Sequence, residues 1–534
     1  MRHASGAWMV PALLATAATA PGAVFQYAVA VETAKGPSAA FLWIPPEAKQ
    51  VRGVVMGGMT LMEREFAKDP AIRKACADQR LAIVFLKCGL GGADLQKVLD
   101  DLAKMSGYHE LSFAPLAFVG HSAGGPQAKA CAAKMAARCF GLVQYRGGVP
   151  GGGEAVPPGV PALMMVGQFD EFGGTMRDET GRERAWEGAR DALAAYRAAD
   201  ERNLAGLVVE PGAGHFAWSA RNAAYLALWL GKAAAARIPD WPVEAKEPVR
   251  CRDVDPRSGW LTDPAIRSAG EFAPAPYGEY KGDKARANWH FDKELAEAAV
   301  AYHAGGFGKK DQFIKWSDPY WVDAGARYFF TNLKWVGDGR TFEVHPVYAD
   351  AYPSPHKSGG PRWVQGGQPV GHSAAPILVK QVSGPVVPTG PNTLRIQYDN
   401  LAPATEGSRV TFMAYSVGDG QYRYTEHVGM MPRGFAGLKG GKDQTIAFPP
   451  LSDLVTTSAP VELKATSDAG LPVEYYVACG PAEVEGGKLR IAEVPVRAAF
   501  PIAVKVVAWQ FGRGLEPLVK TAAPVEQTIQ VEKP

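Results

Sequence analysis

Residues 115–130 read PLAFVGHSAGGPQAKA, and this stretch decides the fold of the chain around it. The apolar letters before Gly120 predict a buried strand, and the alanine-rich letters after Pro126 predict a helix. Between them Ser122 lies in the pattern G-x-S-x-G, which ends at Gly124. Glycines at these two positions leave room for a sharp strand-to-helix turn that presents the serine hydroxyl above a sheet. We therefore expect Ser122 to be a nucleophile.

The letters GHSA occur a second time, at residues 371–374, in a different context. Pro369 precedes this copy, and no apolar strand leads into it. Ala375 and Pro376 follow where a glycine and a helix would be needed. These neighbours do not suit a strand–turn–helix unit, so we do not expect Ser373 to be a nucleophile.

Two later strand ends carry the partners that a nucleophilic serine needs. The apolar run PALMMV leads into residues 167–171, where Asp170 is the candidate acid that orients a histidine, with Glu171 as the alternative. The run LAGLVVE leads through a glycine loop to His215, the candidate general base. Groups at the carboxyl ends of parallel strands gather at one edge of an open sheet. His121, beside the serine, is expected to pack at the turn.

Apolar runs alternate with helix-like segments from Phe25 to Ala236. This alternation predicts a mainly parallel sheet with helices on both faces. The composition changes near residues 237–251, which contain several prolines, and the last 90 or so residues alternate like strands joined by turns. We predict a multidomain chain with an α/β domain at 24–240, an aromatic-rich linking region of unknown role at 241–375, a β-rich domain at 376–443 and a small β-sandwich at 444–534.

From Phe25 to about Ala236 the chain resembles the α/β-hydrolase superfamily. The resemblance rests on GHSAGG, GQFDEF and GAGHF, which bring Ser, Asp and His in that order at successive strand ends. It implies a serine hydrolase that forms an acyl-enzyme and needs no metal or organic cofactor. It also implies an oxyanion hole made by the backbone N–H groups of Ala123 and Met59. Esterases of this type often have an aromatic residue where this chain has Met59.

Around the triad the chain most resembles esterases acting on feruloyl or acetyl esters of plant polysaccharides. A polyester depolymerase of the cutinase type and a general short-chain esterase or lipase are alternatives, and a peptidase also stays open. A further alternative, of another class, is a non-catalytic binding or adhesion protein with a relic hydrolase domain. We predict that substrate contacts involve Trp218, Phe172 and Tyr145.

Residues 444–534 resemble the Ig-like repeats of exported bacterial proteins. This resemblance implies a role as a spacer or adhesion module. We expect the C-terminal domains to contact a polysaccharide surface if the substrate is polymeric.

The first 23 residues, MRHASGAWMVPALLATAATAPGA, combine a short basic start with an apolar stretch and small residues. This pattern predicts a secretory signal peptide, which is too short to span a bilayer. We expect a secreted or periplasmic protein whose mature chain has no integral membrane segment. The formal net charge is only +3, with no long basic run, so nucleic-acid binding has no electrostatic support. Six cysteines in 534 residues do not suggest a disulfide scaffold, and their spacing does not suggest structural zinc.

Overall fold

The structure is a computed structural model of the chain. Met59, Glu171 and Phe172, which the sequence analysis singled out, lie outside the residues it describes, as does nearly all of the predicted signal peptide. The structure describes residues 23–58, 62–153, 155–170, 184–264, 270–317, 321–323, 328–330, 333–352, 367–404, 410–431 and 437–534.

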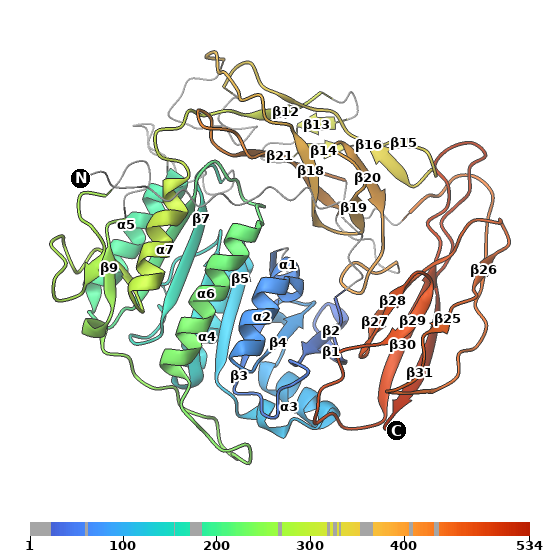
Figure 1. Ribbon diagram of the computed structural model, residues 1–534, viewed down its shortest axis with the longest axis horizontal. Coiled ribbons are helices and arrows are strands. Elements are labelled where there is room, and N and C mark those ends of the chain that lie inside the picture. The colour runs from blue at the N-terminus through green and yellow to red at the C-terminus, as the bar shows by residue number, and fades with distance from the viewer. Residues whose placement is uncertain are drawn as a thin grey trace, which may run out of the picture.

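An eight-stranded sheet forms the N-terminal part of the molecule, in the order β1-β2-β4-β3-β5-β6-β7-β8 (Figure 1). The pairs β1–β2 and β2–β4 are antiparallel, and all other neighbours in this sheet are parallel. The predicted mainly parallel sheet is confirmed, and it fits an α/β-hydrolase domain. The strands are β1 (Tyr27–Thr33), β2 (Gly36–Trp43), β3 (Gly53–Gly58), β4 (Leu81–Leu86), β5 (Leu116–His121), β6 (Cys139–Tyr145), β7 (Ala162–Gly167) and β8 (Ala205–Glu210).

Successive side chains of a strand point to opposite sides of the sheet, so its apolar strands present apolar side chains on both faces. Helices cover both of these faces. Val54 and Met56 belong to the core shared with α3, α4 and α5, whereas Val55 belongs to the core shared with α1, α2, α6 and α7. Within the described part of the chain, no helix is long and apolar enough to cross a membrane. The helices are α1 (Met62–Lys68), α2 (Pro70–Asp78), α3 (Leu95–Ser106), α4 (Gly124–Lys134), α5 (Arg184–Ala199), α6 (Ala220–Arg237) and α7 (Lys293–Ala304).

The residues after α6 cover the outer edge of β8. The Asn288 side-chain oxygen accepts the N–H of Leu207 at 3.2 Å, and Nε2 of His303 accepts the N–H of Val209 at 2.9 Å. Burial lowers the pKa of His303 to about 4, so its ring stays neutral and can accept this bond. These contacts satisfy an otherwise open sheet edge. The nearby small sheet contains β9 (Trp260–Thr262), β10 (Ala275–Pro276) and β11 (Asn288–His290).

The described strands between Ile314 and Met430, which we call the β-rich unit, pair with one another across the predicted boundary at residue 376. A five-stranded sheet has the order β13-β14-β22-β21-β18, and a four-stranded sheet has the order β15-β16-β20-β19. Each sheet therefore joins strands from both sides of that boundary, through pairings that local composition cannot reveal. The strands are β12 (Ile314–Trp316), β13 (Trp321–Asp323), β14 (Tyr328–Phe330), β15 (Lys334–Val336), β16 (Thr341–Glu343), β17 (Pro346–Tyr348), β18 (Leu378–Ser383), β19 (Val386–Pro388), β20 (Thr393–Ile396), β21 (Thr411–Ser416) and β22 (Thr425–Met430).

The C-terminal strands pack directly against the α/β domain, beside β1 and β2 (Figure 1). Residues Ile502, Val504 and Val506 belong to the same hydrophobic core as Tyr27 and Val29. This shared core is at odds with a simple spacer, and the Ig-like assignment stays a prediction. The strands are β23 (Ile446–Ala447), β24 (Leu454–Val455), β25 (Val461–Glu462), β26 (Thr466–Ser467), β27 (Glu474–Cys479), β28 (Ala482–Glu485), β29 (Lys488–Ile491), β30 (Ile502–Trp509) and β31 (Val525–Glu532).

A buried carboxylate fastens the C-terminal region to the α/β domain, and its removal should weaken the fold. Oε1 of Glu110 accepts the Val51 N–H at 3.1 Å and Nη1 of Arg497 at 2.8 Å. Glu110→Ala leaves both donors without this acceptor, so we expect the free energy of unfolding to fall by about 1–3 kcal/mol. The midpoint of urea denaturation measures the change. Glu485→Ala, at an exposed position, is the control, and an equal midpoint for the two variants would contradict the assignment.

Candidate active site

Ser122 lies on a strained turn between β5 and α4. Its φ angle is +54°, in the left-handed region that non-glycine residues rarely adopt. The Ser122 N–H donates to the carbonyl oxygen of Tyr145 at 3.0 Å, and the Gly125 N–H donates to the Ser122 carbonyl oxygen at 3.0 Å. Such strain costs about 1–3 kcal/mol and clusters at functional sites. The turn therefore has the geometry expected for a nucleophile at the carboxyl edge of the sheet.

Neighbouring glycines make this turn sterically feasible. A Cβ atom at Gly120 would lie 2.1 Å from the carbonyl oxygen of Gly124. A Cβ atom at Gly125 would lie 2.0 Å from the carbonyl oxygen of Gly147, in the segment that follows β6. Real Cβ atoms essentially never approach so closely, so any side chain at either position would force the backbone apart. Gly120, in the G-x-S-x-G pattern, and Gly125, directly after it, are thus each required for a steric reason.

His215 and Asp170 form a buried pair at the ends of β8 and β7. Nδ1–H of His215 donates to Oδ2 of Asp170 at 2.8 Å, with Oδ1 at 3.0 Å. Both side chains are about 5% exposed or less. The two loops are also joined by backbone, because the Phe169 N–H donates to the Ala213 carbonyl oxygen at 2.9 Å. A carboxylate in this place fixes the tautomer that leaves Nε2 able to accept a proton.

His121 connects the serine turn to the histidine loop. Its Nε2–H donates to the His215 carbonyl oxygen at 3.0 Å, and the two imidazole centroids are 4.8 Å apart. Its backbone N–H donates to Oε1 of Glu63 at 2.6 Å. Burial, followed by the charge of His215, keeps the pKa of His121 well below its ordinary value. His121 therefore packs as a neutral ring beside Ser122, as expected from its position.

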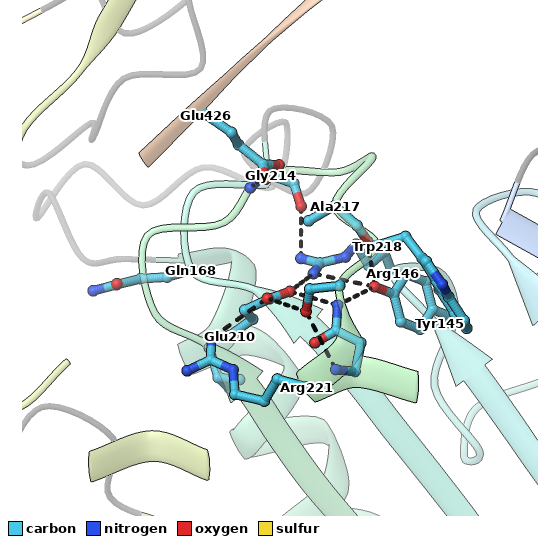
Figure 2. Close-up of polar contacts among 12 residues, drawn as sticks. Tyr145, Arg146, Gln168, Glu210, Gly214, Ala217, Trp218, Arg221 and Glu426 are labelled. Carbon is cyan, nitrogen blue, oxygen red and sulfur yellow. Dashed lines mark hydrogen bonds and ion pairs between the residues drawn. The ribbon is translucent and has the colours of Figure 1, made fainter. Parts of the chain in front are cut away.

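A buried guanidinium lies beneath the histidine loop (Figure 2). Nη1 of Arg146 donates to the Gly214 carbonyl oxygen at 2.6 Å, and Nη2 pairs with the Glu210 carboxylate. A Cβ atom at Gly167 would lie 2.0 Å from Nη1, so only glycine at the end of β7 lets this side chain pass. Burial alone would raise the pKa of Glu210, but Arg146 and then Arg221 hold it below its ordinary value. The pair is therefore ionised and supports the loop from below.

The predicted substrate contacts Tyr145 and Trp218 differ in their exposure. Tyr145 is 1% exposed, and its hydroxyl accepts Nδ2–H of Asn222 at 2.7 Å and donates to the Ala217 carbonyl oxygen. Burial beneath the site is at odds with direct contact between Tyr145 and a substrate. Trp218 is half-buried and donates its ring N–H to Asp69 at 3.1 Å, so its role stays a prediction.

Ala123 is exposed at the N-terminal end of α4, directly after Ser122. A backbone N–H in this place suits an oxyanion donor, and that role stays a prediction, as does the role of Met59. Sequence reasoning missed Glu63, Arg146 and Glu210. A signal existed for two of them, since Arg146 and Glu210 are charged residues at the ends of apolar strand runs.

The second GHSA segment lies in the β-rich unit. Ser373 is 2% exposed, its hydroxyl lies 3.1 Å from the Tyr348 hydroxyl, and its N–H donates to the Gln312 side-chain oxygen at 2.8 Å. It is thus a buried packing residue. Among the side chains that the structure describes, no group of three or more His, Cys, Asp or Glu could hold a metal ion.

No family model and no curated protein matches the chain. Solved structures that match part of it include a dienelactone hydrolase from Anabaena variabilis, at 17% identity, 39% of this chain, 95% of that chain and a TM-score of 0.25. A cold-adapted esterase from an Arctic intertidal metagenomic library matches at 16% identity, 39% and 92% coverage and a TM-score of 0.28. A putative α/β hydrolase from Agrobacterium tumefaciens matches at 13% identity, 40% and 100% coverage and a TM-score of 0.30. These likenesses are too distant to indicate a function for this chain.

Substitution of Gly120 should disable Ser122 by distorting its turn. Because the Cβ atom of Gly120→Ala would meet the Gly124 carbonyl group, we expect Ser122 to react about 100-fold more slowly with a fluorophosphonate probe. Labelling of the folded full-length protein, followed by peptide mapping, measures the rate. Gly188→Ala, at an exposed position of α5 with open space around it, is the matched control. Equal labelling of both variants would refute the steric role of Gly120.

Proposed function

We propose that the protein is a serine hydrolase that cleaves carboxylic esters. The single observation that carries this proposal is the 2.8 Å hydrogen bond between His215 and Asp170, next to the strained turn that presents Ser122. A hydroxyl nucleophile needs a base that is held in one tautomer, and a buried carboxylate on Nδ1 supplies that constraint. The hydrogen bond from the His121 ring to the His215 carbonyl oxygen links the turn that carries Ser122 to the loop that carries the base.

In the proposed reaction, the Ser122 hydroxyl attacks the ester carbonyl carbon while His215 takes its proton. The N–H groups of Ala123 and Met59 are the proposed donors to the oxyanion, and one such donor is worth about 3 kcal/mol. Protonated His215 then gives its proton to the leaving alcohol, which departs and leaves an acyl-enzyme. Water, deprotonated by the same imidazole, hydrolyses that intermediate and restores Ser122.

For the substrate we propose feruloyl or acetyl esters of plant polysaccharides, and for the location we propose the periplasm or the exterior of the cell. The support is the resemblance of GQFDEF and EPGAGHFAW to esterases of that type, together with the N-terminal signal-like segment. Polyester cleavage and general short-chain esterase activity are the alternatives within the same chemistry. A relic domain would not need to maintain the strain at Ser122, which favours an enzyme over an adhesion protein.

The triad assignment predicts graded losses of activity. Ser122→Ala should abolish hydrolysis of p-nitrophenyl acetate, because no nucleophile is left. Asp170→Asn should lower kcat about 10⁴-fold, because an amide cannot hold the required tautomer of His215. Steady-state kinetics on folded protein measure both effects.

Glu171→Gln, at the adjacent carboxylate, is the matched control and should retain nearly full activity. If Glu171→Gln is inactive while Asp170→Asn is active, the orienting acid is Glu171. Wild-type turnover by Ser122→Ala would remove the proposed mechanism altogether.

The substrate assignment predicts the order of kcat/KM among a set of substrates. The set consists of p-nitrophenyl esters of increasing chain length, methyl ferulate, acetylated xylan and a polyester film. We expect kcat/KM to be highest for methyl ferulate or acetylated xylan and to fall as the acyl chain lengthens. Release of ferulate, acetate or p-nitrophenol is measured against the Ser122→Ala protein as blank. Preference for long-chain esters or for the film would instead support the lipase or the polyester alternative.

A further inference from the structure

A short segment of the β-rich unit, Arg423–Glu426, lies against the loops that carry His215 and Asp170. The closest approach is at Gly212, where a Cβ atom would lie 1.8 Å from the Tyr424 carbonyl oxygen. Gly212 has a φ angle of +78°, so this position combines a left-handed backbone with direct contact to another chain segment. The sequence separation between the two segments is about 210 residues, and the fold brings them together at the carboxyl edge of the sheet.

Arg423 holds the loop of Asp170. Its side chain is 3% exposed, and Nη1 donates to the side-chain oxygen of Gln168 while Nη2 pairs with Asp311. The guanidinium carbon lies 4.0 Å from the ring centroid of Phe169. Arg423 thus contacts the two residues that immediately precede Asp170.

Glu426 holds the loop of His215. Its Oε1 accepts the N–H of Gly214 at 2.8 Å, and its Oε2 accepts the Tyr424 hydroxyl at 2.5 Å. The carbonyl oxygen of Gly214 meanwhile accepts Nη1 of Arg146 from within the α/β domain. Figure 2 shows Glu426 and Arg146 on opposite sides of Gly214. The residue before His215 is therefore fixed from two directions.

A third contact holds the far end of the same loop. Nζ of Lys380, on β18, donates to the carbonyl oxygen of Trp218 at 3.0 Å. The loop from Gly212 to Trp218 thus meets the β-rich unit at its start, at the residue before His215 and at its end. A glycine-rich loop has a flexible backbone, so its conformation depends on such external contacts.

We infer that Arg423 and Glu426 are positioning residues for the proposed triad, so that the β-rich unit forms part of the framework of the active site. This inference rests on the proposed function. Each residue acts through the loop that it holds. Their loss lowers turnover by misplacing His215 and Asp170, since a shift of 1 Å can cost about 100-fold in rate.

The test uses the full-length protein and p-nitrophenyl acetate, with kcat, KM and the thermal midpoint measured for each variant. Glu426→Ala removes the acceptor for the Gly214 N–H, and we expect kcat to fall about 10- to 100-fold with KM changed less than about threefold. Glu426→Gln keeps an acceptor oxygen and should recover kcat to within about threefold of wild type. Arg423→Lys cannot reach Gln168 and Asp311 together and should lower kcat about 10-fold.

Matched controls come from an ion pair that joins the β-rich unit to the C-terminal strand β27. Arg340 is buried and pairs with Glu474, so Arg340→Lys and Glu474→Ala match the two test substitutions away from the triad loops. These controls should lower the thermal midpoint as much as the test variants do while keeping wild-type kcat. If Glu426→Ala does not fold, Arg423→Lys and its control decide the outcome.

Wild-type kcat in Arg423→Lys or in folded Glu426→Ala would overturn the inference, as would an equal loss of kcat in the controls. A kcat for Glu426→Gln as low as that for Glu426→Ala would also overturn it, because a hydrogen-bond acceptor would not then be what matters. Ser122→Ala, assayed in parallel, separates the two levels of the proposal. If Ser122→Ala is inactive and the positioning variants are normal, only the positioning role fails. If Ser122→Ala is active, the proposed function fails.

Discussion

The rest of the site depends on the ion pair and hydrogen bond of the buried Arg146 side chain. Arg146 comes directly after β6, and its side chain lies against Gly167, the last residue of β7. Its guanidinium group pairs with Glu210 at the end of β8 and donates to the Gly214 carbonyl oxygen. Three neighbouring strand ends therefore meet at one buried charge. Such a charge is tolerated only when it is paired and hydrogen-bonded, which links the shape of the histidine loop to the packing of the sheet below it.

The backbone at Arg146 shows how tightly this arrangement is constrained. Its φ angle of +51° is close to the +54° of Ser122, and both residues lie at ends of adjacent parallel strands. Gly147, which follows Arg146, packs directly against the serine turn, because a Cβ atom there would lie 2.1 Å from the Ser122 carbonyl oxygen. The two left-handed turns thus support each other, and the serine turn cannot relax without moving the support of the histidine loop.

Much of the α/β domain could be predicted from the sequence because its signals are local. Apolar runs separated by helical spacing predicted the strands, and the letters on either side of GHSA distinguished Ser122 from the buried Ser373. The supporting charges could not be predicted in the same way. Gly214 and Glu426 are separated by 212 positions and Gln168 and Arg423 by 255, and no periodicity links residues so far apart. The pairing of β16 with β20 escaped prediction for the same reason.

Because β1 and β30 contribute to the same hydrophobic core, this core cannot be complete until β30 has been synthesised. The chain is synthesised from the N-terminus, and about 460 residues separate the end of β2 at Trp43 from the start of β30 at Ile502. At typical rates their synthesis takes about 20–90 s. Through that interval the hydrophobic core that contains Tyr27, Val29 and Val31 lacks the contribution of Ile502, Val504 and Val506. An unfinished apolar surface of this kind invites association with other chains. Strands that are synthesised late therefore complete a hydrophobic core to which β1 contributes early.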